Sequence, residues 1–432
     1  MIEIFNNHFE DLCNNLKNQR KKFILGLSGG IDSMALLYLL KNFIKSNKNL
    51  GIEVLPIIID HGLRSNSANE AKDVKYIATH LGFKTIIRKI NIKKPSGNIQ
   101  NWARKERRRI LCDIAFDSSA NILLGHHSDD QVETIFMRSI KSSGIDGLVG
   151  IQDKKIWNGI LIFRPLILFN KNQITSYVNK NNIKYFQDSS NFMCKFERVR
   201  VRGMLKNISL SNWPTISEDL IKFSFLNKIL LKKINHIYFK WIKSNVLIDN
   251  RGALRIDFEK FKYIYESSSL FSINILGKII KTIGGKEFSP KRKKTLNCLK
   301  FIFSFSFKNT NLGNVNISLK NNYLFFIREN RNINFKIKII KNKKYIFDGR
   351  FLLTSKYSGN LINPNIKEFD RECLDEAFVE YKDEINNTIP FMSTLEGVTV
   401  RPHFNNVDVK SDNKSHGKQN GFDLRLINRL LI

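Results

Sequence analysis

The chain has 432 residues, of which 42% are hydrophobic, so it is long enough for about two to four domains with well-buried cores. Its apolar runs stay shorter than the roughly 20 residues that a membrane span needs, and its first residues lack the pattern of a secretory signal, so we expect a cytoplasmic protein that contacts no membrane. The formal net charge of +32, from 71 Lys and Arg against 39 Asp and Glu, favours a polyanionic partner such as nucleic acid.

The first 165 residues alternate short apolar runs with helical patterns, which predicts a parallel sheet covered by helices on both faces. The predicted strands are residues 23–27, 54–59, 84–90, 121–124 and 160–163. The predicted helices are residues 34–43, 68–81, 99–116 and 129–140. Because ligands of such sheets bind at the carboxyl ends of the strands, we expect the functional residues in the loops that follow the strands.

The character of the sequence changes near residue 206. Residues 207–305 have mainly helical patterns, residues 311–335 alternate like strands, and residues 336–432 mix short strands with polar loops. Residues 410–420 are polar and lack apolar side chains, which predicts a mobile segment. We therefore expect a catalytic α/β domain over residues 1–205, a mainly helical domain over 206–310 that contacts nucleic acid, and a small α+β domain over 311–432.

The segment Ser28-Gly29-Gly30-Ile31-Asp32-Ser33 lies between the first predicted strand and the first predicted helix. Glycines allow the backbone to approach a ligand closely, and the N–H groups that open a helix bind phosphate. An aspartate at a phosphate site repels the ligand unless a cation intervenes, so Asp32 indicates Mg²⁺ or an orienting role. The segment lacks the lysine of a Walker loop, and the alternative is a structural turn capped by a serine or aspartate.

This segment resembles the SGGxDS pyrophosphate (PP) loop of the N-type ATP pyrophosphatases, whose fold is that of the adenine nucleotide alpha hydrolases. These enzymes adenylate a carbonyl-type oxygen and release pyrophosphate. The resemblance implies that ATP is the cofactor, with Mg²⁺, and that the loop binds it. The residues implied in ATP binding are Ser28, Gly29, Gly30, Ile31, Asp32 and Ser33.

Five further segments are similar to motifs of the tRNA(Ile)-lysidine synthetase family, over about residues 22–205. One is NIQNWARKERR at residues 98–108, where the family has an Ala-Arg pair followed three residues later by another arginine, here Arg104 and Arg107. Residues 60–64 read DHGLR, and residues 125–134 read GHHSDDQVET, followed by Arg138 and by GIDGL at 144–148. Residues 164–166 read RPL, and residues 188–191 read DSSN ahead of Arg198 and Arg202. The last segment departs from the family pattern at Met193 and Val199, so only contact with phosphate or RNA backbone is carried over for its arginines.

The family joins the ε-amine of free L-lysine to C2 of the wobble cytidine in the CAU anticodon of an isoleucine tRNA, through an adenylated intermediate. The resemblance implies that Asp130 and Glu133, three residues apart on one helical face, bind the lysine and accept a proton, with Asp32 as the third catalytic residue. It implies that Arg104, Arg107, Arg198 and Arg202 contact the tRNA. Helix capping by Asp129 and Asp130, and a solvated basic face for Arg104 and Arg107, are the alternatives.

Three rival functions use the same loop. A tRNA thiolase commonly uses paired cysteines, but Cys13, Cys112, Cys194, Cys298 and Cys373 lie far apart and form no CxxC pair, which also argues against a disulfide or metal framework. A glutamine-dependent synthetase needs a cysteine-led glutaminase domain, which we do not find. A decayed enzyme that only binds RNA is the third, because the C-terminal half is degenerate. AT-rich codons are a competing explanation for the charge, and monomer and homodimer both remain open.

Overall fold

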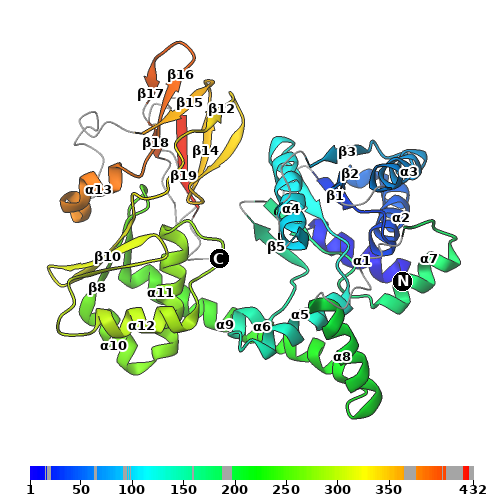
Figure 1. Ribbon diagram of the computed structural model, residues 1–432, viewed down its shortest axis with the longest axis horizontal. Coiled ribbons are helices and arrows are strands. Elements are labelled where there is room, and N and C mark those ends of the chain that lie inside the picture. The colour runs from blue at the N-terminus through cyan, green and yellow to red at the C-terminus, as the bar shows by residue number, and fades with distance from the viewer. Residues whose placement is uncertain are drawn as a thin grey trace. The chain divides into compact units, whose positions relative to one another are not determined.

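The computed structural model describes residues 1–14, 16, 21–62, 66–90, 95, 97, 99–157, 160–186, 197–363, 376–400, 402–404 and 422–427. The chain forms two compact units, Met1–Leu231 and Lys232–Ile432 (Figure 1). In the part of the chain that is described, each helix is too short or too polar to cross a membrane.

The first unit is built on a six-stranded sheet with the order β3-β2-β1-β4-β6-β5. All neighbouring strands are parallel except β5 and β6, which are antiparallel. The strands are β1 (Lys22–Leu27), β2 (Glu53–Asp60), β3 (Ile86–Lys89), β4 (Asn121–Leu123), β5 (Lys154–Trp157) and β6 (Ile160–Phe163). The predicted strands and the predicted parallel sheet are confirmed, whereas the antiparallel edge strand β5 was not predicted.

Helices connect these strands, and the predicted helices are confirmed with small differences at their ends. The unit contains α1 (Ile2–Asn14), α2 (Ile31–Ser46), the 3₁₀ turn η1 (Lys48–Leu50), α3 (Ser67–His80), α4 (Ile99–Asp117), α5 (Ser128–Ile140), α6 (Ile145–Leu148), α7 (Lys171–Lys180) and α8 (Glu197–Ser211). The N-terminal helix α1 was not predicted, although Phe5, Phe9 and Leu12 give it an apolar face that is buried.

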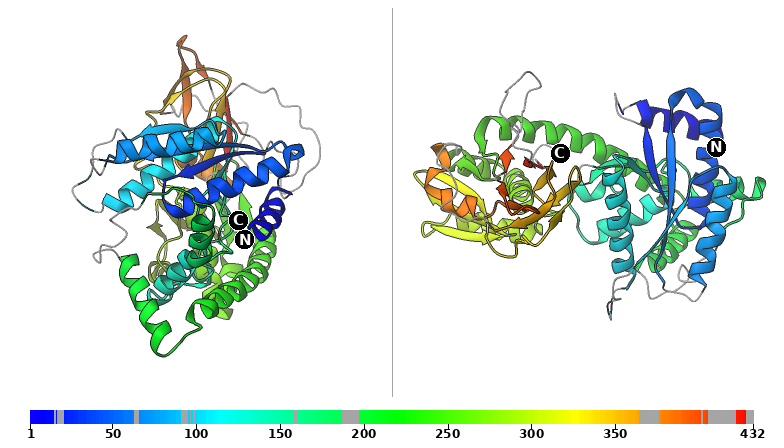
Figure 2. Two further views of the ribbon diagram at one scale, coloured as in Figure 1. Left: turned by 90° about the vertical axis from the view of Figure 1, so that its right-hand side faces the viewer. Right: turned by 90° about the horizontal axis from the view of Figure 1, so that it is seen from above.

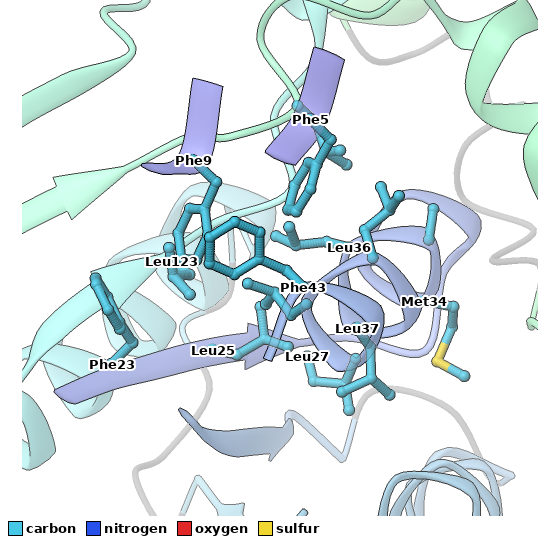
Figure 3. Packing of buried hydrophobic residues seen from close by; sticks show 14 of the residues in the cluster. Phe5, Phe9, Phe23, Leu25, Leu27, Met34, Leu36, Leu37, Phe43 and Leu123 are labelled. Atoms are coloured by element: carbon cyan, nitrogen blue, oxygen red, sulfur yellow. The ribbon is translucent and has the colours of Figure 1, made fainter. Parts of the chain in front are cut away.

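Alternation along β1 fixes which helices cover each face of the sheet, because successive side chains of a strand point to opposite faces. Phe23, Leu25 and Leu27 pack in one core with side chains of α1, α2 and α7, while Ile24 packs on the other face with Leu111 and neighbouring residues of α4. Figure 3 shows the first core, where the rings of Phe9 and Phe43 meet edge to face at a centroid distance of 5.1 Å. Phe5 and Phe23 extend the same aromatic cluster.

The strand order reverses between β1 and β4, the central neighbours of the sheet. In an open α/β sheet, the crevice outside the carboxyl ends of the strands at such a reversal is where ligands bind. The loop of residues 28–33 follows β1, and the segment that begins at Gly125 follows β4. The topology therefore brings the two most distinctive sequence motifs to the same position.

The second unit begins within α9 (Ile216–Asn245), a continuous helix of 30 residues that is visible along its length in Figure 2. A five-stranded antiparallel sheet of order β7-β8-β11-β10-β9 packs against three helices. The strands are β7 (Val246–Ile248), β8 (Leu254–Asp257), β9 (Asn309–Leu312), β10 (Val315–Lys320) and β11 (Tyr323–Arg328), and the helices are α10 (Phe258–Ser267), α11 (Ser269–Ile283) and α12 (Arg292–Ile302). Strands from both sides of residue 310 share this sheet, and the predicted three-domain division stays a prediction.

Two four-stranded sheets follow, with the orders β12-β15-β16-β17 and β13-β14-β19-β18. Their strands are β12 (Lys338–Ile339), β13 (Lys344–Phe347), β14 (Phe351–Ser355), β15 (Gly359–Ile362), β16 (Phe391–Thr394), β17 (Thr399–Val400), β18 (His403–Phe404) and β19 (Phe422–Leu426). The 3₁₀ turn η5 (Glu376–Tyr381) and the helix α13 (Lys382–Asn386) precede β16. The predicted strands after residue 311 are confirmed, and the predicted mobile segment 410–420 lies outside the described residues.

A buried ionic cluster joins β11 to the turn between β13 and β14. Asp348, whose side chain is 9% exposed, accepts hydrogen bonds from Arg328 Nε at 2.9 Å and from Arg350 Nε at 2.8 Å. The side chains of Arg328 and Arg350 are 2% and 0% exposed. Arg350 also donates to the carbonyl oxygen of Thr388 at 2.8 Å. This cluster is closed to solvent and belongs to the interior of the unit.

Candidate active site

The loop of residues 28–33 leaves the first turn of α2 open to a ligand. Its N-cap is Gly30, which has no side chain to accept from the first helical N–H groups. The hydroxyl of Ser33 donates to the carbonyl oxygen of Gly30 at 2.9 Å and lies 3.1 Å from the hydroxyl of Ser28. Both hydroxyls therefore face the same turn as the free N–H groups, an arrangement that suits phosphate.

Two glycines bring other segments against this loop. Gly29 has φ +80°, and a Cβ atom there would lie 2.6 Å from Val74 Cγ2 of α3. At Gly125, after β4, a Cβ atom would lie 3.3 Å from the carbonyl carbon and oxygen of Asp32. The N–H of Phe186 also donates to the carbonyl oxygen of Gly29 at 3.0 Å. The loop is thus held from both sides: the positive φ of Gly29 favours glycine, and a side chain at Gly125 would fit tightly against the backbone of Asp32.

A pocket of about 190 Å³ lies beside the loop, at the ends of β1 and β2. Its lining includes Leu27, Ser28, Ile58, Asp60 and Arg107. This volume is below the roughly 300–1,000 Å³ of typical small-molecule sites, so the pocket suits one part of a nucleotide. Residues 63–65, which include part of the DHGLR motif, lie outside the described residues.

The segment after β4 places two histidines and a carboxylate at the start of α5. Asp130 accepts from the N–H of His127, the N-cap residue, at 3.2 Å, and its Oδ2 lies 3.7 Å from His127 Nε2. Burial would raise the pKa of Asp130, but the histidines, Arg198 and the His127 N–H hold that pKa below its usual value. Burial lowers the pKa of His126 to about 3, so this imidazole is neutral.

Asp130 thus has a capping role in the structure, as the alternative interpretation proposed, and it also faces charged groups on other elements. The neighbouring Asp129 accepts from the hydroxyl of Ser128 at 3.2 Å. A carboxylate that only capped the helix would not need the cations that surround Asp130. Capping and a role in binding are therefore compatible here.

Glu133, one turn further along α5, is the most buried carboxylate of the site, with a side chain 2% exposed. Its Oε1 accepts from Arg202 Nε at 2.8 Å, while its Oε2 has no hydrogen-bond partner among the residues that the structure describes. Burial raises the pKa of Glu133, although Arg202 opposes the shift. One oxygen is therefore paired with Arg202, and the other is a buried position where a proton would be stabilised.

The predicted tRNA-binding arginines of α8 lie against the predicted lysine-binding carboxylates. Arg198 donates to Asp130 Oδ1 at 3.4 Å and to Thr134 Oγ1 at 3.3 Å, in addition to the contact of Arg202 with Glu133. The side chains of Arg198 and Arg202 remain 31% and 56% exposed. Residues 188–191, the DSSN part of this motif, and Met193 lie outside the described residues.

Arg104 and Arg107 of α4 lie close to the same charges. Loss of solvation, with repulsion from Arg198 and Arg107, lowers the pKa of Arg104 to about 10, and burial lowers the pKa of Arg107. Arg104 therefore remains protonated near neutral pH. Arg104 keeps an exposed side chain, whereas Arg107 is half-buried and lines the pocket beside β2.

Lys171 is a residue of this site that the sequence did not indicate. It is the first residue of α7, and its Nζ lies 2.5 Å from Asp32 Oδ1. His127 Nε2 lies 3.9 Å from the other oxygen of Asp32. No helix was predicted at residues 171–180, so the sequence did not show that this cation lies at a helix N-terminus, where the helix dipole disfavours it.

Other motif residues support the backbone. The side chain of Gln131 donates to the carbonyl oxygen of Val149 and to the hydroxyl of Ser224, and it accepts from the N–H of Ile151. Arg138 donates to the carbonyl oxygen of Gly147 at 2.7 Å. These contacts hold the turn that contains α6, so the GxxGL part of the motif is structural.

Within the described residues, no group of three or more His, Cys, Asp or Glu side chains forms a metal cage. Mg²⁺ commonly binds proteins through one or two carboxylates and completes its coordination with substrate phosphates and water. Asp32, with a side chain 29% exposed beside the open turn of α2, fits a cation that arrives with a nucleotide.

Comparison with known proteins identifies the PP-loop domain in the first unit and relates most of the chain to known relatives. A family model described as the PP-loop domain matches residues 1–208. A tRNA(Ile)-lysidine synthase of Wolbachia pipientis is 30% identical over 387 residues, which cover 86% of this chain and 88% of the relative. The enzyme of the same name from Rickettsia bellii is 29% identical over 94% of this chain and 96% of the relative. That from Orientia tsutsugamushi is 26% identical over 91% of this chain and 92% of the relative.

Proposed function

The chain belongs to the tRNA(Ile)-lysidine synthase family, and we propose that it joins lysine to C2 of the wobble cytidine in the CAU anticodon of an isoleucine tRNA. It is an ATP-using ligase built on a PP-loop domain. The observation that supports this function best is the position of the carboxylates of α5 beside the open first turn of α2, at the reversal of the strand order.

We propose that the loop of residues 28–33 binds the phosphates of ATP and that the pocket beside β1 and β2 takes the adenosine. The free N–H groups of α2 and the hydroxyls of Ser28 and Ser33 would hold the phosphates. Asp32 would hold Mg²⁺, which compensates phosphate charge when bound. In the first step, the cytidine O2 bonds to the α-phosphorus of ATP, and pyrophosphate leaves.

In the second step, the lysine amine bonds to C2, and AMP leaves with O2. The ammonium of lysine has an unperturbed pKa of about 10.4, so it must lose a proton before it attacks. Glu133 is suited to accept that proton, because its pKa is raised toward neutral pH and its Oε2 lacks a partner among the described residues. Asp130, whose pKa is lowered, is suited to hold the ammonium.

The basic residues around these carboxylates are suited to the RNA backbone. We propose that Arg104, Arg107, Arg198 and Arg202 contact phosphates of the anticodon arm. Arg198 contacts Asp130, and Arg202 contacts Glu133. RNA phosphates bound by these two arginines would therefore bring the wobble base near the two carboxylates. The regions 206–310 and 311–432 would bind the remainder of the tRNA.

The test is incorporation of radiolabelled lysine into an isoleucine tRNA transcript with the CAU anticodon, in the presence of ATP and Mg²⁺. A methionine tRNA that also carries CAU and an Asp32→Ala protein are the controls. Label in the isoleucine tRNA alone, lost in the variant, supports the proposal. Absence of label with the unaltered protein would reject it. Light scattering of the same sample separates monomer from homodimer.

A further inference from the structure

Lys171 connects the starts of three helices that surround the candidate nucleotide site. Its ammonium contacts Asp32 in the first turn of α2 at 2.5 Å, and its backbone N–H donates to Asp129 Oδ2 of α5 at 3.4 Å. Lys171 itself begins α7, where the side chain of Asn170 accepts from Gln173 N at 2.9 Å. One lysine thus touches acidic groups from the segments that follow β1 and β4.

The stability of the fold does not account for this contact. The side chains of Lys171 and Asp32 are 39% and 29% exposed, and ion pairs at such positions contribute little to folding. A cation at the start of a helix also opposes the helix dipole. The placement of Lys171 therefore indicates a second negative partner, one that is absent when the site is empty.

We propose that Lys171 belongs to the nucleotide site, where its ammonium holds Asp32 while the site is empty and contacts a β- or γ-phosphate oxygen once ATP and Mg²⁺ are bound. This inference rests on the proposed binding of phosphates by the loop of residues 28–33. A nucleotide at that loop places negative charge beside Asp32. When Asp32 turns to the cation of the nucleotide, the ammonium of Lys171 loses its partner and gains a phosphate.

The structure permits this exchange without movement of α7. The backbone of Lys171 is fixed by Asp129 and by the reciprocal hydrogen bonds between Asn170 and Gln173. Its side chain is a flexible four-carbon chain that ends in a compact charge with three donors. The ammonium therefore changes partners by rotation of its side chain alone.

The first test is equilibrium binding of nucleotide by Lys171→Met, which removes the charge and keeps the length, and by Lys171→Arg, which keeps the charge. Lys180→Met, at the exposed far end of the same helix, is the matched control. We expect Lys171→Met to weaken the binding of ATP with Mg²⁺ by about 10–100-fold, the range for a lost hydrogen bond between charged groups. Lys171→Arg should recover most of the affinity, and the control should bind normally.

AMP separates phosphate contact from general damage. Because AMP lacks the β- and γ-phosphates, its affinity should be the same for Lys171→Met and the unaltered protein, as should the melting temperature of the nucleotide-free protein. Unchanged binding of ATP by Lys171→Met would overturn the proposal. An equal loss for AMP and ATP would also overturn it, as would a defect confined to the KM for lysine.

A second arm examines the exchange itself. In EDTA, Asp32→Asn should bind ATP more tightly than the unaltered protein, because a repelling charge is removed and Lys171 is released. Adding Lys171→Met to Asp32→Asn should weaken that binding, and equal binding by Asp32→Asn and the double variant would show that Lys171 does not reach the phosphates. These binding measurements do not depend on catalysis. If the unaltered protein binds ATP and labels no tRNA, the proposed function fails and the inference on Lys171 still stands.

Discussion

The two units use pairs of oppositely charged side chains in contrasting ways. In the second unit, Arg328, Asp348 and Arg350 form a closed cluster whose side chains are at most 9% exposed. In the first unit, the pairs of Asp32 with Lys171 and of Glu133 with Arg202 each include a cation that is at least 39% exposed. The closed cluster cannot exchange partners without leaving a buried charge unpaired, whereas the pair of Asp32 with Lys171, half-exposed on both sides, can.

This difference separates structural charges from functional ones better than the residue types do. Both kinds of pair join a basic side chain to a carboxylate, and the sequence alone does not distinguish the structural pairs from the functional ones. Breaking a buried pair leaves an uncompensated charge in the interior, which is costly. Breaking a half-exposed pair returns the groups to water, so its cost to folding is small and its effect falls on ligands.

The largest effect is expected for Glu133→Gln, which removes a proton acceptor and retains the size of the side chain. Lysidine formation in a single turnover should fall by about 10²–10⁴-fold, the usual contribution of a general base, while ATP binding is unchanged. Because the pKa of Glu133 is raised, the rate of lysidine formation by the unaltered protein should begin to fall at a higher pH than the usual pKa of a glutamate would give. Glu218→Gln, at an exposed position of α9, is the control. Full turnover by Glu133→Gln would exclude this role.

The next largest effect is expected for Asp348→Asn in the closed cluster. Asp348 has φ +48°, which asparagine tolerates, so the substitution tests the charge rather than the backbone. It leaves two buried arginines unpaired and should cost about 3–5 kcal/mol in the free energy of unfolding. Urea unfolding, with hydrogen exchange of β11 and β14, measures the loss. Arg331→Met, at a side chain 83% exposed, should change stability by less than about 0.5 kcal/mol. Equal effects of the two variants would remove the distinction between the pairs.

An effect that is smaller for each pH unit is expected from His126 as the pH changes. Burial, with repulsion from Arg164, Arg104 and Arg107, lowers its folded-state pKa to about 3, whereas an unfolded histidine titrates near pH 6.5. Since the unfolded chain binds this proton more readily, stability should decrease as the pH falls from about 6.5 toward 3, at up to about 1.4 kcal/mol per pH unit from this group. Urea midpoints at several pH values measure the slope. His126→Gln should reduce the slope, and an unchanged slope would contradict the assignment.

The smallest effect is expected for Lys228→Met, which removes a half-exposed ion pair outside the site. Lys228 Nζ lies 2.9 Å from Asp153 Oδ1, with side chains 40% and 27% exposed. The loss should be at most about 1 kcal/mol and should diminish in high salt. Thermal melting at two salt concentrations measures it. A salt-independent loss above about 2 kcal/mol would show that exposure does not separate the two classes of pair.

The sequence predicts the sheet of the first unit because apolar runs such as residues 23–27 and 160–163 are short and lie between clear helical patterns. The edge strand β5 was missed because Lys154 and Lys155 interrupt its apolar character. In the second unit, β7 and β8 were missed within a region of helical pattern, because each has only three or four residues. β8 pairs with β11, which is distant in the sequence, and β7 pairs with β8.

The candidate site is predicted in part. The loop of residues 28–33 and the start of α5 were identified by motif, and the order of the strands brings them together. The contacts of Arg198 with Asp130 and of Lys171 with Asp32 join residues that are 68 and 139 positions apart. Such pairings depend on how helices pack in three dimensions, which the local pattern around either residue does not contain.

The contact at Gly125 has a mechanical consequence. Because Gly125 has no side chain, the backbone after β4 packs directly against the carbonyl group of Asp32. We therefore expect a nucleotide that shifts the first turn of α2 to shift the segment before α5 as well. Adenylation and the attack by lysine would then depend on the same backbone contact.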